Sequence, residues 1–260
     1  ELREVLRRPG VLLSLIVGPF AIMFIFGLGY SGYRDPFRTE IVIPAGNDFP
    51  RETDYYEGLA PGRLDVVGVD IEPQPNYCGD EFYQADALDF LVANGRQFDA
   101  RHASPPCQAS CALIKGNQRA TAGNHTNLIP ETRALLAYFD GPSVIENVQG
   151  SDLRRDLTLC GEMFGLGVIR HRYFECSFPV HQPAHKPHRG RVRGWRHGQY
   201  HDGPYVAVYG DGGAKGTVAE WQQAMGIDWT DVRKEIAEAI PPAYSAFVGR
   251  QLMQAIERAA

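Results

Sequence analysis

The chain of 260 residues has few cysteines, no repeating unit and no excess of positive charge. Its five cysteines are an odd number scattered over a long chain, which excludes a disulfide framework and favours a reducing compartment. The absence of any fixed sequence period excludes repeat architectures. A net charge of -5 excludes a uniformly basic surface, so any affinity for nucleic acid must come from local patches. The hydrophobic share of 44% is high enough to bury a core in one or two domains.

Residues 11–30 are an apolar stretch without a single charge, long enough to cross about 30 Å of hydrocarbon. We therefore expect a transmembrane helix there, with the preceding basic residues and the N-terminus on the cytoplasmic side. The alternative is a buried core hairpin that breaks at Gly18 and Pro19. A cleaved signal peptide fits less well, because the apolar stretch is too long and no small-residue cleavage site follows it closely.

Beyond residue 64 the pattern changes to apolar strand-like runs that alternate with segments of helical periodicity. This alternation predicts an α/β fold with a mostly parallel sheet, whose ligands bind at the carboxyl ends of the strands. The expected strands are 65–71, 98–104 and 143–148, and the expected helices are 85–95 and 130–139.

Chemically active residues stand where these strands end. Asp70 ends the first strand, Cys107 follows the second within Pro-Pro-Cys-Gln, and Glu146 ends the third. Two prolines would fix the turn that presents the Cys107 thiol, and partial burial would raise the pKa of Glu146. A thiol beside a protonatable carboxyl suits attack on a ring and stabilisation of the resulting anion. The alternative for Cys107 is a small buried apolar residue.

Four motifs carry a resemblance to a known family. They are ASPPCQ (103–108), ENV (146–148), RHRYFE (170–175) and EAIPPAYSAFVGRQL (238–252). In this order they resemble the DNA (cytosine-5) methyltransferase family, most like its compact phage and bacterial members, over about residues 66–260. The resemblance implies the Rossmann-like α/β fold of S-adenosylmethionine-dependent methyltransferases and a role in DNA methylation, as in restriction-modification.

The resemblance also implies roles for individual residues. The thiolate would add to carbon 6 of a cytosine flipped out of double-stranded DNA, because the reacting atoms are stacked inside the duplex. The glutamate would contact ring nitrogen N3 and the exocyclic amine, while two arginines would hold the phosphate and the base. The implied catalytic residues are Cys107, Glu146, Arg170 and Arg172, and the implied DNA contacts include Gln108 and Asn147.

The cofactor expected from the resemblance is S-adenosylmethionine. Asp70 matches the acid that binds the ribose hydroxyls, Ile71 would pack on the adenine, and Asp86 would accept from the adenine amine. Pro105 is expected to line the same site. The alternative for both aspartates is an ordinary helix cap.

The chain lacks the family's opening strand, glycine-rich loop and helix, so cofactor binding is expected to be impaired. In their place, residues 1–64 resemble the N-terminus of an ABC-transporter permease, which suggests a chimera of that segment with a methyltransferase domain at 65–260. A strand near 41–43, a helix at 51–59 and the strand at 65–69 would still form a β-α-β unit with its two strands adjacent. Two alternatives remain: a membrane-protein fragment fused to an inactive methyltransferase remnant, and a nucleic-acid binder without turnover.

Residues 177–216 occupy the position of a short target-recognition insert. Between Ser177 and Tyr200 this insert holds cations and Trp195, which can pack on a sugar or a base, but no acid. This composition favours contact with DNA phosphates over a merely solvated loop. No metal is expected, since the spacing of Cys176, His181, His185 and His188 matches no usual zinc pattern. We expect a cytoplasmic monomer with membrane contact through residues 11–30. The cations expected to contact DNA are Lys186, Arg189, Arg191, Arg193 and Arg196.

Overall fold

The computed structural model describes residues 38–42, 65–77, 79–106, 127–196, 198–210 and 216–259, with residues 38–42, 65 and 196 as backbone only. All of them belong to one unit that begins at Phe37. The predicted nucleophile Cys107, the neighbouring Gln108 and the predicted membrane segment 11–30 lie outside the described residues.

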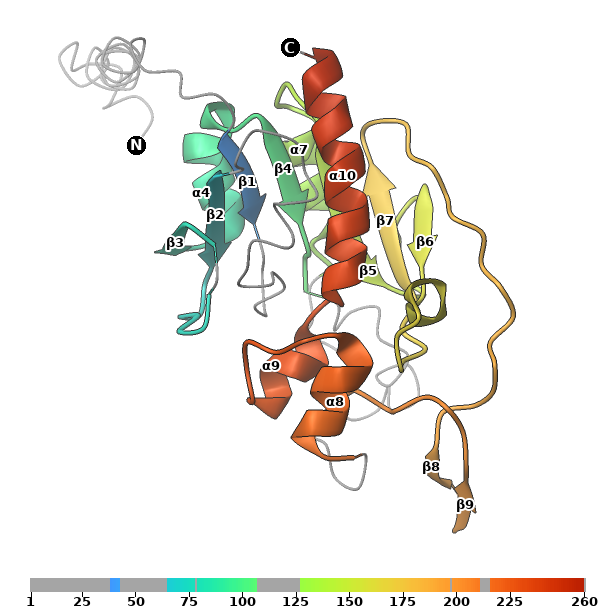
Figure 1. Ribbon diagram of the computed structural model, residues 1–260. Helices are drawn as coiled ribbons and strands as arrows, with labels where there is room; N and C mark the ends of the chain where they lie inside the picture. Colours follow the sequence, from blue (N-terminus) through green and yellow to red (C-terminus); the bar gives the residue numbers. More distant parts are fainter. Residues whose placement is uncertain are drawn as a thin grey trace, which may run out of the picture. The chain divides into compact units, whose positions relative to one another are not determined.

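The unit is built on a seven-stranded sheet in the order β3-β2-β1-β4-β5-β7-β6 (Figure 1). The first five strands in this order are mutually parallel, whereas β7 runs antiparallel to both β5 and β6. The expected α/β fold with a mostly parallel sheet is therefore confirmed. The strands are β1 (Arg38–Val42), β2 (Asp65–Asp70), β3 (Glu81–Gln84), β4 (Ala100–Ala103), β5 (Ser143–Val148), β6 (Leu157–Leu159) and β7 (Arg172–Cys176).

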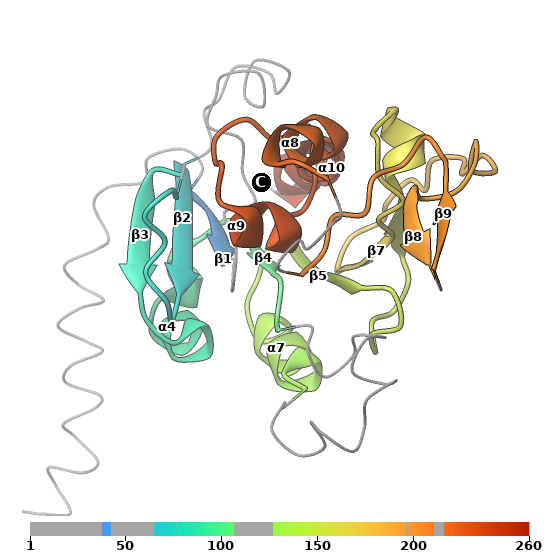
Figure 2. The same cartoon turned by 90° about the horizontal axis from the view of Figure 1, so that it is seen from below.

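Helices cover both faces of the sheet (Figures 1 and 2). On one face, α4 (Ala87–Asn94) and α7 (Ile129–Leu136) pack on Val69, Ala103 and Ile145. On the other, α10 (Pro242–Ala259) packs on a separate cluster of strand residues. Its buried apolar side chains recur every four residues, which gives a single apolar stripe along the helix. They are Tyr244, Val248, Leu252 and Ile256.

The predicted β-α-β unit is confirmed in one part. Strand β1 pairs in parallel with β2, with Thr39 opposite Val66, so the first strand does lie beside the second. It begins at Arg38, earlier than the run 41–43 predicted, and its other edge pairs with β4. The helix expected at 51–59 lies outside the described residues.

A second, smaller core lies beyond the sheet. Helices α8 (Val218–Met225) and α9 (Arg233–Glu238) bury Trp221, Met225 and Ile236 against Val168 and Val208. Thr217 caps α8 through a reciprocal bond with Glu220, and Gly226 ends the helix in the left-handed conformation. The insert between β7 and α8 contains one antiparallel hairpin, β8 (Gly194–Arg196) with β9 (Gln199–His201).

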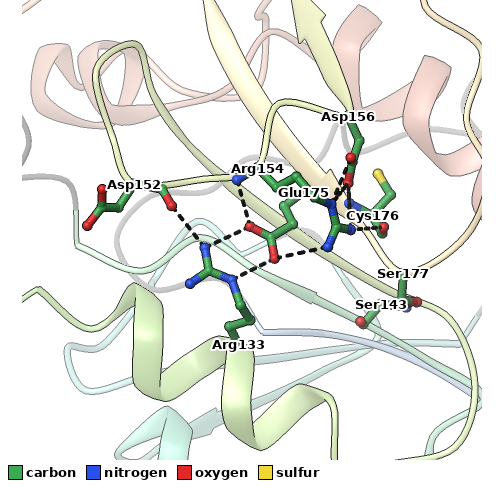
Figure 3. Close-up of polar contacts among 8 residues, drawn as sticks. All are labelled: Arg133, Ser143, Asp152, Arg154, Asp156, Glu175, Cys176 and Ser177. Carbon is green, nitrogen blue, oxygen red and sulfur yellow. Dashed lines mark hydrogen bonds and ion pairs between the residues drawn. The ribbon is translucent and has the colours of Figure 1, made fainter.

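An ionic network fastens β7 to α7 (Figure 3). The Arg133 guanidinium on α7 donates from two nitrogens to the Glu175 carboxylate on β7, at 2.7 and 2.8 Å. The backbone N–H of Arg154 donates to the same carboxylate, while the Arg154 side chain is held by Asp156. Strand β7 is therefore anchored through Glu175 to α7 and to the segment before β6, which matters because it carries Arg172 at its first position.

Among the helices that the structure describes, none combines the length and the apolar character that a membrane crossing requires. The segment predicted to span, residues 11–30, does not belong to that part of the chain and stays a prediction.

Candidate active site

The carboxyl ends of five parallel strands meet at one edge of the sheet. From β1 the strand order runs outward through β2 to β3 on one side of the sheet, and from β4 it runs to β5 on the other side. The order therefore reverses between β1 and β4. Such a reversal of strand order is the place where open α/β sheets bind ligands. The predicted cofactor residues, together with Glu146 and Asn147, come from the ends of β2, β4 and β5 and from the turn after β3, so the topology gathers them at this edge. Arg172 is the first residue of β7, and Arg170 lies just before that strand.

Three predicted cofactor residues lie together at the ends of β2 and β3. Asp70 is buried at the last position of β2, opposite Gln84, and its carboxylate accepts from the Glu72 N–H at 2.8 Å. Ile71, the next residue, is 69% exposed although it is apolar. Asp86 follows β3 and caps α4, accepting from two backbone N–H groups through Oδ1 alone.

These contacts bear on the two interpretations of the aspartates. Asp86 is a helix cap, as the alternative proposed, although its Oδ2 takes no part in the cap. Asp70 is no cap, because its carboxylate organises the turn 70–74, also accepting from Gln74 Nε2 at 3.0 Å. A buried acid followed at once by an exposed apolar side chain fits the ribose and the flat base of an adenosine.

The exits of β4 and β5 are joined directly. The buried Asn147 side chain donates from Nδ2 to the carbonyl oxygen of Pro105 at 2.7 Å. Pro105 is itself buried, and Pro106 is the last described residue before residue 107. This bond brings the segment leading to the predicted nucleophile against the strand that carries Glu146. Asn147 is thus engaged with the protein backbone, whereas the resemblance implied a contact with DNA.

Glu146 is a buried acid beside a partly buried arginine. Its side chain shares a face of the sheet with Arg172 of β7, whose Nε lies 2.9 Å from Glu146 Oε1. Burial raises the pKa of Glu146, and the positive charges of Arg172 and Arg170 and the Ser104 hydroxyl oppose the rise without cancelling it. The predicted direction of this pKa shift is confirmed, and a carboxyl in this state keeps its proton closer to neutral pH.

The second predicted arginine is held by the protein backbone. Arg170 donates to the carbonyl oxygens of Val208 and Ala237, at 2.9 and 2.6 Å, and its own carbonyl accepts from the buried Tyr244 hydroxyl at 2.7 Å. Arg170 therefore ties the α8-α9 core and α10 to the start of β7. Its charge still reaches Glu146, but the bonds that fix it are structural.

The basic insert is more neutralised than its sequence indicates. Arg189 lies 2.8 Å from Glu162, and Arg193 is ion-paired with Glu220, so acids from distant segments meet two of the predicted DNA contacts. Lys186 and Arg191 are exposed. Trp195 on β8 is 67% exposed and meets the Tyr200 ring edge-on at 5.8 Å between centroids. The side chain of Arg196 lies outside the described residues.

Two features of the site region were missed by sequence patterns. His102 on β4 is buried, and burial lowers its pKa to about 4. Cys160 and His171 lie with His185 and His188 in one group, whereas the set considered from the sequence contained Cys176 and His181 instead. Cys176 is buried on β7 and His181 is exposed. The four residues of this group come from segments too far apart in sequence for a spacing rule to connect them.

Comparisons with known proteins give a limited likeness. No protein-family model matches the chain, and no curated protein does. Among solved structures, one match is a mutant of the DNMT2 of Spodoptera frugiperda, with a TM-score of 0.36 and 19% sequence identity. The match covers 56% of this chain, and the chain spans about half, 54%, of that structure.

Proposed function

We propose that the chain is a cytosine-5 methyltransferase that acts on DNA and forms a covalent adduct through Cys107. The observation that carries the proposal is the convergence of two strand exits. Asn147 binds the carbonyl of Pro105, two residues before Cys107, and the adjacent Glu146 is a buried carboxyl of raised pKa. A thiol and a carboxyl of raised pKa that can donate a proton, placed on neighbouring exits, are what attack on a cytosine ring needs.

In this mechanism the Cys107 thiolate adds to carbon 6 of the flipped-out base, and a sulfur–carbon bond forms as the electron pair of the ring double bond moves toward carbon 5 and N3. Glu146 donates its proton at N3 and so stabilises the adduct. Arg172, at 2.9 Å from Oε1, positions the carboxyl. Carbon 5 would take the methyl group that the cofactor supplies. A base from solvent would then remove the carbon 5 proton and the N3 proton would return to Glu146, so that the ring double bond re-forms as the sulfur–carbon bond breaks and Cys107 leaves as a thiolate.

S-adenosylmethionine is the proposed cofactor, and it supplies an electrophilic methyl group when bound. The residues at the ends of β2 and β3 fit its adenosine. Asp70 would bind the ribose hydroxyls, the exposed Ile71 would pack on the base, and Asp86 has an oxygen outside its helix cap for the amine. The sequence offers no glycine-rich loop for the methionine end, so we propose a cofactor affinity below that of a complete site.

Covalent trapping tests the proposal. The full chain, supplied with S-adenosylmethionine, should form a stable adduct with duplex DNA that carries 5-fluorocytosine, because fluorine blocks the loss of the carbon 5 substituent. A Cys107→Ser variant should form none, whereas Cys111→Ser, at the next cysteine along the chain, should still trap. Equal trapping by the Cys107 variant and the unmodified chain would refute the assignment.

Glu146 requires a separate variant. Glu146→Gln keeps the size of the side chain but cannot transfer a proton to N3, so trapping should slow by at least about a hundredfold, the lower end for a general acid. DNA that binds the unmodified chain but is neither trapped nor methylated would leave a nucleic-acid binder without turnover in place of the proposed enzyme.

A further inference from the structure

Four metal-ligating side chains gather between the sheet and the basic insert. Cys160 follows β6, His171 precedes β7, and His185 and His188 lie in the loop after β7. One donor atom from each lies within 4.8 Å of all the others. We call these four residues the Cys-His cluster. It is separate from Asp70, Ile71 and Asp86, and it makes no use of Glu146.

Two distances within the Cys-His cluster match the edges of a tetrahedron. Cys160 Sγ lies 3.4 Å from His188 Nε2, and His171 Nε2 lies 3.3 Å from His185 Nε2. In a tetrahedral zinc site the known bond lengths place two imidazole nitrogens ~3.3 Å apart and a sulfur and a nitrogen ~3.6 Å apart. Both pairs of donor atoms are therefore already at the separation that one shared ion requires.

The donor set selects the kind of metal. One thiol and three imidazoles suit zinc, whereas magnesium and calcium prefer oxygen ligands. The carboxylate closest in sequence, Glu162, is engaged elsewhere, because it pairs with Arg189 and accepts from the Tyr205 hydroxyl. Four protein ligands with no open position are typical of a structural zinc site.

The alternative is a metal-free cluster held by its own contacts. The rings of His171 and His185 are stacked with centroids 5.3 Å apart, and His188 meets His185 edge-on at 5.0 Å. Hydrogen bonds between neutral imidazoles would also allow the 3.3 Å distance, since one ring nitrogen donates and the other accepts. Neither contact, however, requires the Cys160 sulfur to join the same group.

We propose that the Cys-His cluster binds one zinc ion that fastens the basic insert to the edge of the sheet. The ion would join the end of β6, the start of β7 and the loop at 185–188. His171 stands directly before Arg172, the partner of Glu146. The same ion therefore fixes the start of β7, where Arg172 lies, and it also fixes the loop that carries Lys186 and Arg191.

Metal analysis of the full chain tests this directly. The purified chain should hold one zinc per molecule, measured by mass spectrometry after removal of loosely bound metal. His185→Asn changes an exposed ligand and should lower zinc affinity by at least about tenfold, as even outer-shell changes do. His181→Asn, an exposed histidine of the same loop outside the cluster, should leave the zinc content unchanged.

A second measurement keeps the proposal testable if ligand variants fold poorly. Cobalt replacing the metal in the unmodified chain should give the intense visible bands of a tetrahedral ion and a thiolate charge-transfer band. Cys160→Ser should remove that band, which separates this cysteine from the other four. A chain without zinc whose cobalt spectrum is that of the hydrated ion would overturn the proposal, as would full zinc content in both Cys160→Ser and His185→Asn.

Discussion

The Asn147 side chain donates to the Pro105 carbonyl across 2.7 Å, and this bond couples the exit of β5 to the exit of β4. Both partners are buried, so the carbonyl has no water to replace the amide. The strand that carries Glu146 is thereby joined to the segment that leads to Cys107. This side-chain contact is additional to the backbone hydrogen bonds between β4 and β5.

Asn147→Ala should therefore destabilise the fold. The loss of the donor leaves a buried carbonyl without its partner, and we expect a decrease of about 1–3 kcal/mol in the free energy of unfolding, measured by urea denaturation. Asn147→Asp should cost at least as much at neutral pH, because two oxygens then face each other. Gln97→Ala, which removes an exposed side-chain bond, should change stability by less than about 0.5 kcal/mol.

The burial of His102 predicts that the folded state loses stability in acid. Burial lowers its pKa to about 4, so the folded state binds fewer protons than the unfolded state between about pH 6.5 and 4. The stability that this provides is complete above pH 6.5 and is lost as the pH falls through 4, with a total on the order of 3 kcal/mol. Unfolding curves recorded across this range should show the decline.

His102→Leu should remove most of that decline. Its Nε2 has no hydrogen-bond partner among the described residues, so an apolar side chain leaves no donor or acceptor stranded there. The exposed His181→Leu serves as the control and should retain the slope of the unmodified chain. A His102→Leu chain with an unchanged slope would show that another group causes the acid sensitivity.

The Arg133–Glu175 pair should couple more strongly than an exposed pair. Glu175 is buried and receives two parallel bonds from Arg133 (Figure 3). A double-mutant cycle with Arg133→Met and Glu175→Gln should give a coupling energy of about 1–3 kcal/mol, given that Arg133 is partly exposed. The same cycle on Lys234 and Glu72, an exposed pair at 3.8 Å, should give no more than about 1 kcal/mol.

Cations of the basic insert should differ in their effect on DNA binding. Lys186→Gln together with Arg191→Gln should reduce the slope of log affinity against log salt by about 0.9 for each phosphate that the insert no longer neutralises. Arg189→Gln should act mainly on stability, because this guanidinium is paired with Glu162. Lys234→Gln, an exposed lysine on α9, is the control. An unchanged slope in the double variant would leave the insert without a role in DNA binding.

Much of the central sheet could be predicted from the sequence, because β2, β4 and β5 are short buried runs with clear ends. Strand β5 coincides with the predicted run at 143–148. Strand β3, Glu81–Gln84, was missed because it is a short edge strand whose side chains are mostly exposed, so it lacks an apolar signal. Strand β7 was hidden by the motif RHRYFE, which was interpreted only as chemistry, and β6 has only three residues, too few for an apolar period to show.

Features of the site could be predicted from the sequence where they depend only on a residue's position at the end of a strand. Features that depend on contacts between distant segments could not be predicted. The burial of Glu146 followed from its place after Val144 and Ile145, and its pKa shift followed from that burial. The pairing of Arg189 and Arg193 with Glu162 and Glu220 joins residues 27 positions apart, and no local pattern encodes it. The Cys-His cluster was missed for the same reason.

The position of β1 has a practical consequence for any shortened form of the protein. This strand, Arg38–Val42, lies between β2 and β4 and pairs with both. A fragment that starts at residue 65, where β2 begins, would lack it. Two parallel edges from the middle of the sheet would then be left open, and such edges recruit strands from other molecules. A fragment meant to stay monomeric should therefore begin before Arg38.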